Sequence, residues 1–467
     1  MFYREIIENL NNWAERKTRK PLILRGARQV GKTTAVEMFS KQFDQYISLN
    51  LEKAEERVLF EKQYPFSDLL MAIFVYARKD RHGGRTLLFI DEIQHSPKAV
   101  ALLRYFKEEA GDIFVIAAGS LLETIMNPKI SYPVGRVEYM VMYPVSFREF
   151  LLASGEEQSL EQLQKDDVPA FLHSHLIRLF KQYITIGGMP QVVDEYVQNK
   201  DITALQPIYE SLLDSYSGDV EKYAPSSPQV QYIRHILTTA FEQAGNRITL
   251  ENFGGSTYKY REMKEAFTTL EKTWLFRLVY PTTAVTIPAL PKLKLKPRLH
   301  TLDTGLVNYA SNMVKDLLTA DDIADVYRGR IAEHITGQEL LARSTSVMNK
   351  LHFWVREKKQ SSAEIDYIFQ HNDKLIPIEV KSGAIGKLRS LHQYMDQAPH
   401  NIAVRVYQGE YLVQKAKTIA GKEFTLLNLP FYLVHRIERE IDKLTNGLKP
   451  GGNGGERSSD PWLENQG

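Results

Sequence analysis

The stretch LILRGARQVGKTT, Leu22–Thr34, decides the fold expected of this chain. Its first residues are mostly apolar, as in a buried strand, and a helix-like segment follows it. Within it, the pattern G-x-x-x-x-G-K-T is completed by Gly26, Gly31, Lys32 and Thr33. In this strand-to-helix context the glycines let backbone N–H groups curl round phosphate oxygens, and the helix N-terminus adds partial positive charge. The stretch therefore predicts a phosphate-binding loop, or P-loop.

The residue types of the loop predict how a nucleotide is held. Lys32 is placed to reach the β- and γ-phosphates, and Thr33 is placed to bind Mg²⁺. We expect ATP to be bound by Gly26, Ala27, Arg28, Gln29, Val30, Gly31, Lys32, Thr33 and Thr34. The alternative is a chance match to the pattern, which the neighbouring strand and helix disfavour.

An acidic pair, Asp91 and Glu92, closes the apolar run LLFIDE. Four apolar residues followed by two acids at the end of a strand have the form of a Walker B motif. Asp91 is expected to hold Mg²⁺, usually through water, and Glu92 to orient or deprotonate the attacking water. The alternative is an acidic pair that caps a helix.

Two further residues are candidates for catalysis at the same site. The next strand ends in AAGS, where Ser120 can place a hydroxyl between Asp91 and the γ-phosphate; a plain turn serine is the alternative. Arg136 precedes a fifth strand-like run. An arginine there can neutralise transition-state charge in its own or a neighbouring subunit, although a surface arginine is equally consistent with the sequence.

Strand-like and helix-like segments alternate from about residue 20 to residue 145. The strand-like runs are PLILRG, QYISLNLE, RTLLFIDE, DIFVIAAGS and VEYMVMYP. Short, nearly continuous apolar runs are typical of a parallel sheet that is covered on both faces. The alternation indicates an α/β, doubly wound domain.

Composition bounds the remaining possibilities. The chain has 467 residues, enough for about three domains, with 43% apolar and 25% charged residues. The net charge of +2 restricts any nucleic-acid binding to local patches. The absence of cysteine excludes disulfides and cysteine-ligated zinc. We expect neither a secretory signal nor a membrane-spanning run, and therefore a cytoplasmic protein without membrane contact.

These motifs resemble those of AAA-type ATPases that carry a DUF4143 C-terminal region, a prokaryotic family. Besides the P-loop and LLFIDEIQ, the resemblance rests on AAGS, YPVSFREF, IGGMP, TLDTGLVNY, RGRIAEHITGQEL and IEVKSG. It covers roughly residues 1–435. It implies an ASCE P-loop core, a helical lid, a winged helix and a nuclease-like end, and it implies no particular substrate.

The segment pattern and the resemblance together place the expected domains. They predict a P-loop AAA-type core at 1–145, a helical lid at 146–222, a winged helix-turn-helix at 223–312, a PD-(D/E)xK nuclease-like α/β domain at 313–435 and a disordered tail at 445–467. A run of helices followed by strands favours the winged helix, and Gly- and Ser-rich composition favours disorder of the tail.

Cations in the middle region suggest contact with nucleic acid. A predicted helix carries Lys259, Arg261 and Lys264, and the run KLKLKPR alternates apolar residues with Lys292, Lys294, Lys296 and Arg298. On a strand this alternation puts four cations on one face, where they can lie along phosphates. DNA contact is therefore expected through residues 257–298. A lysine-guarded edge strand, or the docking of a protein, is the alternative.

The stretch EIDYIFQHNDKLIPIEVKSG, Glu364–Gly383, resembles the core of PD-(D/E)xK nucleases. In that core an acid ends one strand and E-x-K lies on the next. Glu379 and Lys381 share a face of their strand, and Asp366 across the hairpin can complete a carboxylate pair for Mg²⁺. Lys381 is then expected to stabilise the phosphate or the attacking hydroxide.

Two residues outside this stretch extend the candidate nuclease site. Glu333, on the preceding helix, lies where this type of core often supplies a further acid, and Gln393, on the following helix, is an accessory candidate. Residues 333–394 are therefore a second candidate contact for DNA. The alternative is a solvated hairpin face without activity, because a fold does not carry its chemistry along.

The sequence as a whole predicts an ATP-binding, ATP-hydrolysing protein with ATP and Mg²⁺ as cofactors. Nucleotide state is expected to move the lid and winged helix and so to control the nuclease-like region. The alternative is a nucleotide-gated switch or scaffold whose winged helix and inactive nuclease-like domain dock a protein partner. Kinase activity toward a small acceptor is a weaker third possibility, and whether the chain forms a homo-oligomer stays open.

Overall fold

The P-loop strand lies inside a five-stranded sheet in the computed structural model, which describes residues 2–119, 135–224, 226–314, 329–356, 363–381 and 388–445. The strands are β1 (Leu22–Arg25), β2 (Gln45–Asn50), β3 (Thr86–Asp91), β4 (Phe114–Ala118) and β5 (Glu138–Val141). Their order is β2-β3-β4-β1-β5, and each neighbouring pair is parallel. The predicted parallel sheet of a P-loop NTPase is therefore confirmed.

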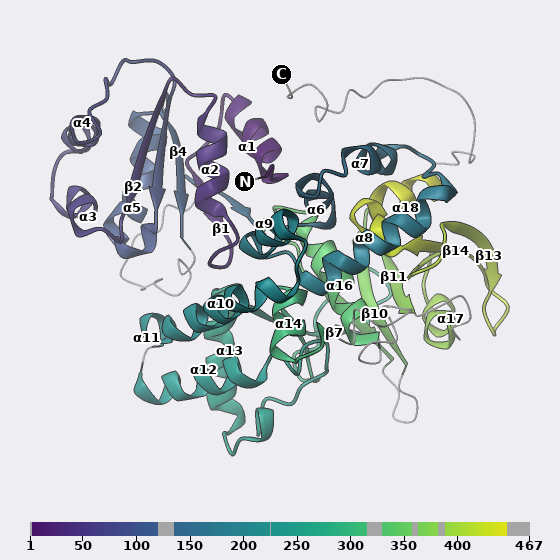
Figure 1. The fold of residues 1–467 in the computed structure, drawn as a ribbon. Helices are drawn as coiled ribbons and strands as arrows, with labels where there is room; N and C mark the ends of the chain where they lie inside the picture. Colours follow the sequence, from purple (N-terminus) through teal and green to yellow (C-terminus); the bar gives the residue numbers. More distant parts are fainter. Residues whose placement is uncertain are drawn as a thin grey trace. The chain divides into compact units, whose positions relative to one another are not determined.

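Helices cover both faces of this sheet (Figure 1). On one face lie α1 (Ile6–Glu15) and α2 (Lys32–Ser40), and on the other α3 (Ala54–Glu61), α4 (Phe66–Tyr76) and α5 (Pro97–Glu109). Trp13 of α1 packs edge-on against Phe114 of β4, and Phe60 of α3 and Phe74 of α4 join the core of the opposite face. Burial on both faces explains why the strands read as unbroken apolar runs.

A helical region follows the sheet. Its helices are α6 (Phe147–Ala153), α7 (Glu157–Gln164), α8 (His173–Ile186), α9 (Pro190–Asn199), α10 (Gln206–Gly218) and α11 (Val220–Tyr223). Ser146 and Glu149 start α6 with a capping box, in which each side chain accepts a hydrogen bond from the other residue's backbone N–H. Pro190 starts α9 after the Gly187–Gly188 turn and the N-cap Met189, and its fixed φ suits the first helical position.

The middle region has the element order that the sequence predicts for a winged helix. Its elements are α12 (Ser227–Thr239), α13 (Tyr260–Lys272), β6 (Phe276–Val279), β7 (Pro281–Thr282), β8 (Arg298–Thr301) and α14 (Thr304–Ala310). β6 and β8 pair antiparallel, and a short 3₁₀ turn over Phe253–Gly255 stands between the two longer helices.

The predicted cationic strand of this region is wrong. Lys292, Lys294 and Lys296 lie in the loop between β7 and β8, and the backbone N–H of Leu295 closes a turn on the carbonyl of Lys292 (3.0 Å). Pro291 and Pro297 flank the turn, and proline cannot donate to a strand ladder. The alternation of lysine and leucine therefore does not put its cations on one strand face.

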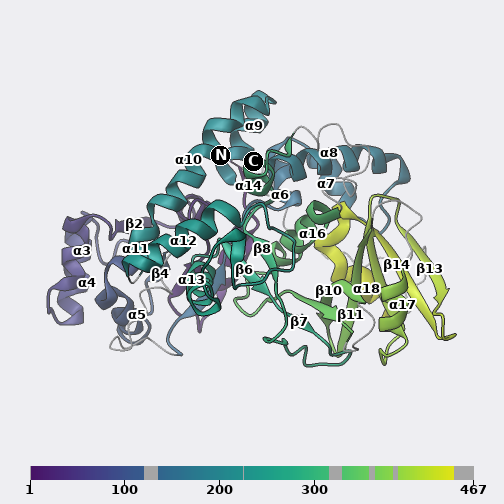
Figure 2. The ribbon, with the colours of Figure 1, turned by 90° about the horizontal axis from the view of Figure 1, so that it is seen from below.

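A seven-stranded mixed sheet makes up the C-terminal region. Its order is β13-β14-β12-β11-β10-β9-β7. The strands are β9 (His352–Val355), β10 (Glu364–His371), β11 (Lys374–Lys381), β12 (Ile402–Tyr407), β13 (Leu412–Lys417) and β14 (Glu423–Pro430), with helices α16 (Arg330–Ala342) and α17 (Arg389–Met395). β10 and β11 form an antiparallel hairpin, and β11 pairs with β12 in parallel. Helix α16 contacts both β11 and β8, which links this sheet to the middle region (Figure 2).

Residues 1–435 form one compact unit, and residues 436–467 form a second that contains α18 (Ile437–Thr445). The predicted disordered tail lies, except for Thr445, outside the described residues. In the part of the chain that the structure describes, no helix combines the length and apolar character needed to cross a bilayer.

Candidate functional site

The P-loop has the backbone geometry that its glycines permit. Gly26 has φ +143°, and a Cβ on it would lie 2.3 Å from the carbonyl oxygen of Met142, so a side chain there would clash with the end of β5. Gly31, with φ +91°, stands at the N-cap of α2. The loop therefore turns sharply from β1 into the N-terminus of α2, where backbone N–H groups and the helix dipole favour an anion.

Lys32 is the buried cation of the loop. Its Nζ donates to the carbonyl oxygens of Gly26 (3.0 Å) and Ala27 (2.7 Å). Burial lowers the pKa of Lys32 to about 8, and the neighbouring Glu92 and Asp91 carboxylates oppose that effect. The ammonium group is thus a desolvated cation beside two acids, which is the environment in which a phosphate contact is strongest.

Asp91 and Thr33 bring two oxygen ligands together. Thr33 Oγ1 donates to Asp91 Oδ2 (2.7 Å), and the backbone N–H of Glu92 donates to Asp91 Oδ1 (2.9 Å). Burial raises the pKa of Asp91, and the hydrogen bond from Thr33 opposes that rise. A hydroxyl and a carboxylate at the edge of a phosphate site are the oxygen ligands that Mg²⁺ prefers, so these residues fit the predicted metal.

Glu92 is held by a residue that sequence analysis missed. Glu92 has a left-handed backbone (φ +49°), and the 3₁₀ turn Ile93–His95 that follows brings the Gln94 amide back to donate to Glu92 Oε2. Gly119 leaves room for this amide, because a Cβ there would lie 2.2 Å from Gln94 Oε1. The sequence places Gln94 at the end of the stretch LLFIDEIQ but does not indicate this contact, which the 3₁₀ turn creates.

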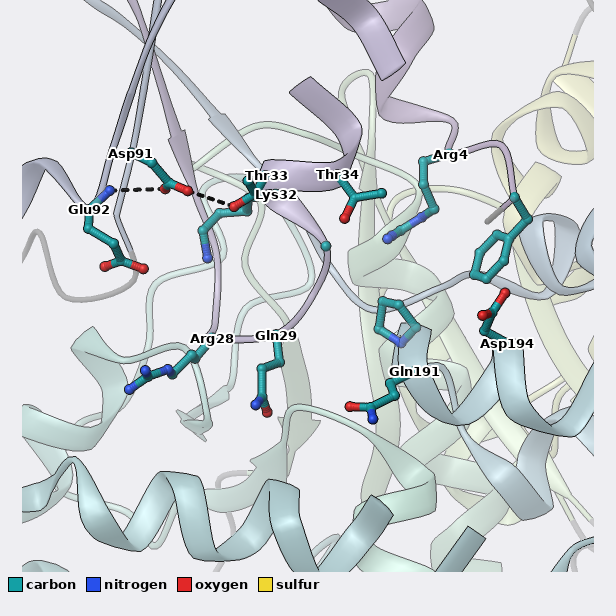
Figure 3. Close-up of a pocket in the computed structure, with 13 residues that line it drawn as sticks. Arg4, Arg28, Gln29, Lys32, Thr33, Thr34, Asp91, Glu92, Gln191 and Asp194 are labelled. Carbon is teal, nitrogen blue, oxygen red and sulfur yellow. Dashed lines mark hydrogen bonds between the residues drawn. The ribbon is translucent and has the colours of Figure 1, made fainter. Parts of the chain in front are cut away.

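These residues surround a cavity of about 590 Å³, a size usual for a small-molecule site. Its lining residues are Phe2, Arg4, Arg28, Gln29, Gly31, Lys32, Thr33, Thr34, Asp91, Glu92, Pro190, Gln191 and Asp194. Figure 3 shows Asp91 and Glu92 on one side of the P-loop, and Gln191 and Asp194 of α9 on the other. The N-terminal segment and α9 were not predicted to contribute, because they are distant from the loop in sequence.

Three residues of the predicted nucleotide set do not line this cavity. The side chains of Ala27 and Val30 are buried in the core, and the carbonyl of Gly26 accepts from Lys32. The carbonyl of Val30 accepts from Arg4 Nη1 (2.8 Å), and Arg4 Nε also pairs with Glu149 of α6 (2.9 Å). Arg4 thereby ties the P-loop to the first helix of the helical region.

The two further catalytic candidates have different outcomes. Ser120 lies outside the described residues. Arg136 does not line the cavity of its own chain; its Nε pairs with Glu108 of α5 (3.0 Å), and its side chain is 55% exposed. The prediction that Arg136 reaches a nucleotide in its own subunit is therefore wrong, since its side chain is held on the outer surface by Glu108.

Motifs from three parts of the chain meet in a buried network beside this cavity. The Asp303 carboxylate accepts from the backbone N–H of Gly188 (2.5 Å) and of Leu306 (3.2 Å), and from Gln338 Nε2 (3.3 Å). Gly187 must lack a side chain, because its Cβ would lie 2.2 Å from Asp303 Oδ1. The network joins the turn before α9, the start of α14 and helix α16, so a wall of the cavity is fixed to the C-terminal region.

Glu339 of α16 extends the same network. Its Oε1 accepts from Tyr183 OH (2.7 Å) and from the backbone N–H of Phe147 (3.1 Å), and the side chain is buried. Burial raises the pKa of Glu339 to about 7, whereas these hydrogen bonds lower it. The α16 helix thus places a carboxyl group with a raised pKa between α6 and α8.

Replacement of Glu339 by glutamine is expected to remove part of the pH dependence of stability. The folded protein retains the Glu339 proton up to a pH of about 7, whereas the unfolded chain releases it near 4.5. Wild-type stability should therefore fall as the pH rises through this window. Relative to wild type, the glutamine variant should gain about 1–3 kcal/mol in free energy of unfolding between about pH 5 and pH 8.

Thermal unfolding across this pH range measures the difference. Glu37→Gln on the exposed face of α2 is the control, and parallel profiles for wild type and Glu339→Gln contradict the prediction.

The candidate nuclease residues form an acidic cluster at the start of α16 and on the β10–β11 hairpin. Asp366 lies inside β10, whereas the resemblance predicted an acid at the end of a strand. Its Oδ2 accepts from the backbone N–H of Val380 (2.8 Å). Glu379 Oε1 pairs with Lys381 Nζ (2.8 Å). Burial, followed by the Asp366 carboxylate, raises the pKa of Glu333 and of Glu379 to about 8. The structure therefore does bring the predicted acids together.

Arg298 enters this cluster from β8, which the sequence gave no reason to expect. Its Nη1 lies 3.2 Å from Glu333 Oε2, and its Nη2 lies 2.5 Å from Glu364 Oε1 and 3.7 Å from Asp366 Oδ1. Its side chain is only 7% exposed. The prediction that Arg298 contacts DNA is therefore wrong. The predicted Mg²⁺ does not fit Asp366 and Glu379 either, because Arg298, Lys381 and a backbone N–H already engage three of their four carboxylate oxygens.

The other predicted nucleic-acid contacts are scattered. Arg261 is 89% exposed on α13 and pairs with Glu265 (3.0 Å), which neutralises it. Lys259 is the N-cap of α13. Gln393 Oε1 accepts from Arg356 Nη1 (2.9 Å). Among the described residues, no group of three or more histidine, aspartate and glutamate side chains is arranged to hold a metal ion.

Family models match three stretches of the chain. An AAA domain matches residues 18–151, a domain of unknown function (DUF8612) matches residues 177–317, and a domain of unknown function (DUF4143) matches residues 328–432. The second match spans the end of the helical region and the middle region, and sequence analysis did not anticipate it. No curated protein matches the sequence.

Several solved structures resemble the chain at low identity. The Walker-type ATPase of Pyrococcus abyssi is 18% identical, and the match covers 67% of this chain and 96% of that one with a TM-score of 0.44. The RuvB Holliday junction branch migration motor of Thermotoga maritima is 13% identical over 60% of this chain and 90% of that one, with a TM-score of 0.27. Drosophila ORC bound to DNA is 12% identical over 66% and 94%, also with a TM-score of 0.27. Nothing about substrate or partner follows at these values.

The first and third family matches coincide with the two ends of the resemblance that the motifs indicated. The P-loop, Asp91 and Glu92 lie in the first match, and Glu333, Asp366 and the hairpin lie in the third. The chain therefore carries an AAA domain at its N-terminus and a DUF4143 domain in its C-terminal region, as the motifs indicated.

Proposed function

We propose that this protein binds ATP and hydrolyses it in a Mg²⁺-dependent reaction at the cavity beside the P-loop. The observation that carries the proposal is the convergence of Lys32, the Thr33–Asp91 pair and Glu92 on one cavity at the N-terminus of α2. A cation, two oxygen ligands for a metal ion and a carboxylate oriented by Gln94 are the parts that phosphoryl transfer to water requires.

Each side chain has a distinct task in the proposed reaction. Lys32 exchanges its carbonyl contacts for the β- and γ-phosphates, and Thr33 and Asp91 hold Mg²⁺, which neutralises phosphate charge. Glu92 accepts the proton of the attacking water, and Gln94 orients Glu92. Arg4, Gln191 and Asp194 are placed to contact the rest of the nucleotide.

Hydrolysis is proposed to move the helical region and, through it, the C-terminal region. The support is the network of Asp303, Gln338 and Glu339, which joins the turn before α9 to α16. Helix α9 lines the cavity, and helix α16 carries Glu333 of the acidic cluster at its start. Through this network, α16 therefore connects the wall of the cavity to the acidic cluster. The middle region is proposed as a winged helix and the C-terminal region as a nuclease-like fold. The first assignment rests on element order, and the second rests on the resemblance of residues 364–383 to that fold and on the acidic cluster.

A second candidate function is a nucleotide-gated switch or scaffold whose nuclease-like region docks a partner without cutting DNA. The position of Arg298 inside the acidic cluster favours it. Cleavage assays on single-stranded, duplex and branched DNA with Mg²⁺ or Mn²⁺ decide between the two candidates. Cleavage that Asp366→Ala abolishes excludes the scaffold.

Replacement of Lys32 by alanine tests the nucleotide site itself. Loss of a charge-assisted phosphate contact in a buried site is expected to weaken ATP binding by about 10- to 100-fold and to abolish measurable hydrolysis. Titration with ATP and a steady-state phosphate-release assay measure the two effects. Lys41→Ala, at the exposed C-terminal end of α2, is the matched control and should behave as wild type. Equal hydrolysis by wild type and Lys32→Ala would overturn the proposal.

A further inference from the structure

The acids and the arginine of the C-terminal cluster come from different parts of the fold. Glu333 lies on α16, and Glu364 and Asp366 lie on β10. Arg298 lies on β8, whose backbone is paired with β6 on one side and with residues 246–248 on the other. The backbone of Arg298 is thus held by the middle region, while its guanidinium group lies among carboxylates of the C-terminal region.

The guanidinium group occupies a defined position in the cluster. Besides its contacts with Glu333, Glu364 and Asp366, Arg298 Nη1 donates to the backbone carbonyl of Asp366 (3.2 Å). Its Cζ lies 4.9 Å from the centre of the Phe353 ring, so an aromatic face supports the cation. A planar fork of donors that bridges three carboxylates satisfies them in the way that a bound cation does.

Three of the four carboxylate oxygens of Asp366 and Glu379 face protein donors. Asp366 Oδ2 accepts from Val380, and Asp366 Oδ1 faces Arg298. Glu379 Oε1 pairs with Lys381. Glu379 Oε2 is buried and has no hydrogen-bond partner among the described residues. Carboxylates that already surround a guanidinium group gain little from a second cation, because like charges repel in a site of low dielectric constant.

We propose that Arg298 is the resident cation of this cluster and takes the place in which a nuclease-like centre would hold its divalent metal ion. The centre is then metal-free as long as β8 stays against α16 and β10. This inference rests on the proposed nuclease-like fold and not on ATP hydrolysis.

Binding of Mn²⁺ to the full-length protein without nucleotide tests this inference. All proteins carry Asp91→Asn, so that the cavity beside the P-loop lacks the carboxylate proposed to hold Mg²⁺, and Mn²⁺ binding there is the same background in every variant. Electron paramagnetic resonance, which counts free Mn²⁺, should show no binding that depends on Asp366 when Arg298 is present. Arg298→Gln should raise Mn²⁺ affinity by at least about tenfold, because the acids lose their internal cation. Adding Asp366→Asn should abolish the gain.

Matched variants separate the roles of the two arginines near Glu364. Arg247 Nη1 lies 3.3 Å from Glu364 Oε2 at the partly exposed rim, so Arg247→Gln removes a cation of the same type without opening the centre. It should leave Mn²⁺ binding unchanged. The inference is overturned if the protein with Arg298 intact binds Mn²⁺ and Asp366→Asn removes that binding. The absence of any gain in a folded Arg298→Gln protein overturns it as well.

Removal of a buried arginine can prevent folding, because it leaves carboxylates unpaired. If Arg298→Gln does not fold, Arg298→Met combined with Glu364→Gln removes the guanidinium group and its nearest acid together. Circular dichroism establishes that the double variant is folded. It retains Glu333, Asp366 and Glu379, so it should bind Mn²⁺ more tightly than the protein with Arg298, and failure to do so contradicts the inference.

Discussion

Glu92→Gln is expected to lower kcat for ATP hydrolysis by about 10²–10⁴-fold while ATP binding persists. Glutamine has nearly the same shape and keeps an oxygen acceptor, but it cannot take the proton of the attacking water. The contacts proposed to hold phosphate and metal involve Lys32, Thr33 and Asp91 and do not use the Glu92 side chain. The substitution therefore removes an interaction that matters in the transition state and leaves the bound ground state largely intact.

Single-turnover hydrolysis and ATP titration of the same preparations separate these two quantities. Glu37→Gln is the matched control, since it makes the same chemical change on the exposed face of α2. A Glu92→Gln protein that hydrolyses ATP at the wild-type rate excludes Glu92 as the base. A protein that fails to bind ATP shows instead that Glu92 holds the pocket together.

Asp303→Ala is expected to destabilise the protein by about 3–5 kcal/mol. Asp303 is fully buried, and its carboxylate accepts from Gly188, Leu306 and Gln338. Alanine leaves these donors without their acceptor in the interior, where each unsatisfied group costs about 1–3 kcal/mol. It also removes the N-cap of α14.

Thermal unfolding of wild type, Asp303→Ala and Asp303→Asn measures this effect. Asparagine keeps one acceptor oxygen, so we expect its loss of stability to lie between those of wild type and alanine. Asp373→Ala, in the exposed turn of the β10–β11 hairpin, should unfold as wild type does. An Asp303→Ala protein as stable as wild type would show that the turn before α9 finds other acceptors.

Much of the nucleotide site could be predicted because its signals are local. The glycines of the P-loop, the helix after it and the acids at the end of β3 follow from backbone geometry and strand termination within short stretches. Phe2, Arg4, Gln191 and Asp194 could not be found in this way, because they reach the cavity only after α1 and α9 pack against the sheet. Gln94 needed the 3₁₀ turn after Glu92, which no local pattern announces.

The middle region shows where periodicity misleads. Alternation of lysine and leucine over residues 292–296 has the period of a strand, but this segment forms a turn between Lys292 and Leu295 and lies outside the strands. Arg298 was grouped with the lysines for the same reason, although it alone lies on a strand and is buried. A period of two specifies which residues share a face only if the segment is extended.

Residue types and spacing were enough to predict the parallel sheet, the P-loop, the acidic pair at the end of β3 and the gathering of Glu333, Asp366, Glu379 and Lys381. These features depend on one or two neighbouring elements. Three contacts became known from the packing of the fold: Arg298 lies among the C-terminal acids, Arg136 turns away from its own cavity, and Asp303 joins the turn before α9 to α16. Each of these contacts pairs charges or polar groups far apart in the chain, and such pairs are fixed by how whole elements pack, which no local pattern encodes.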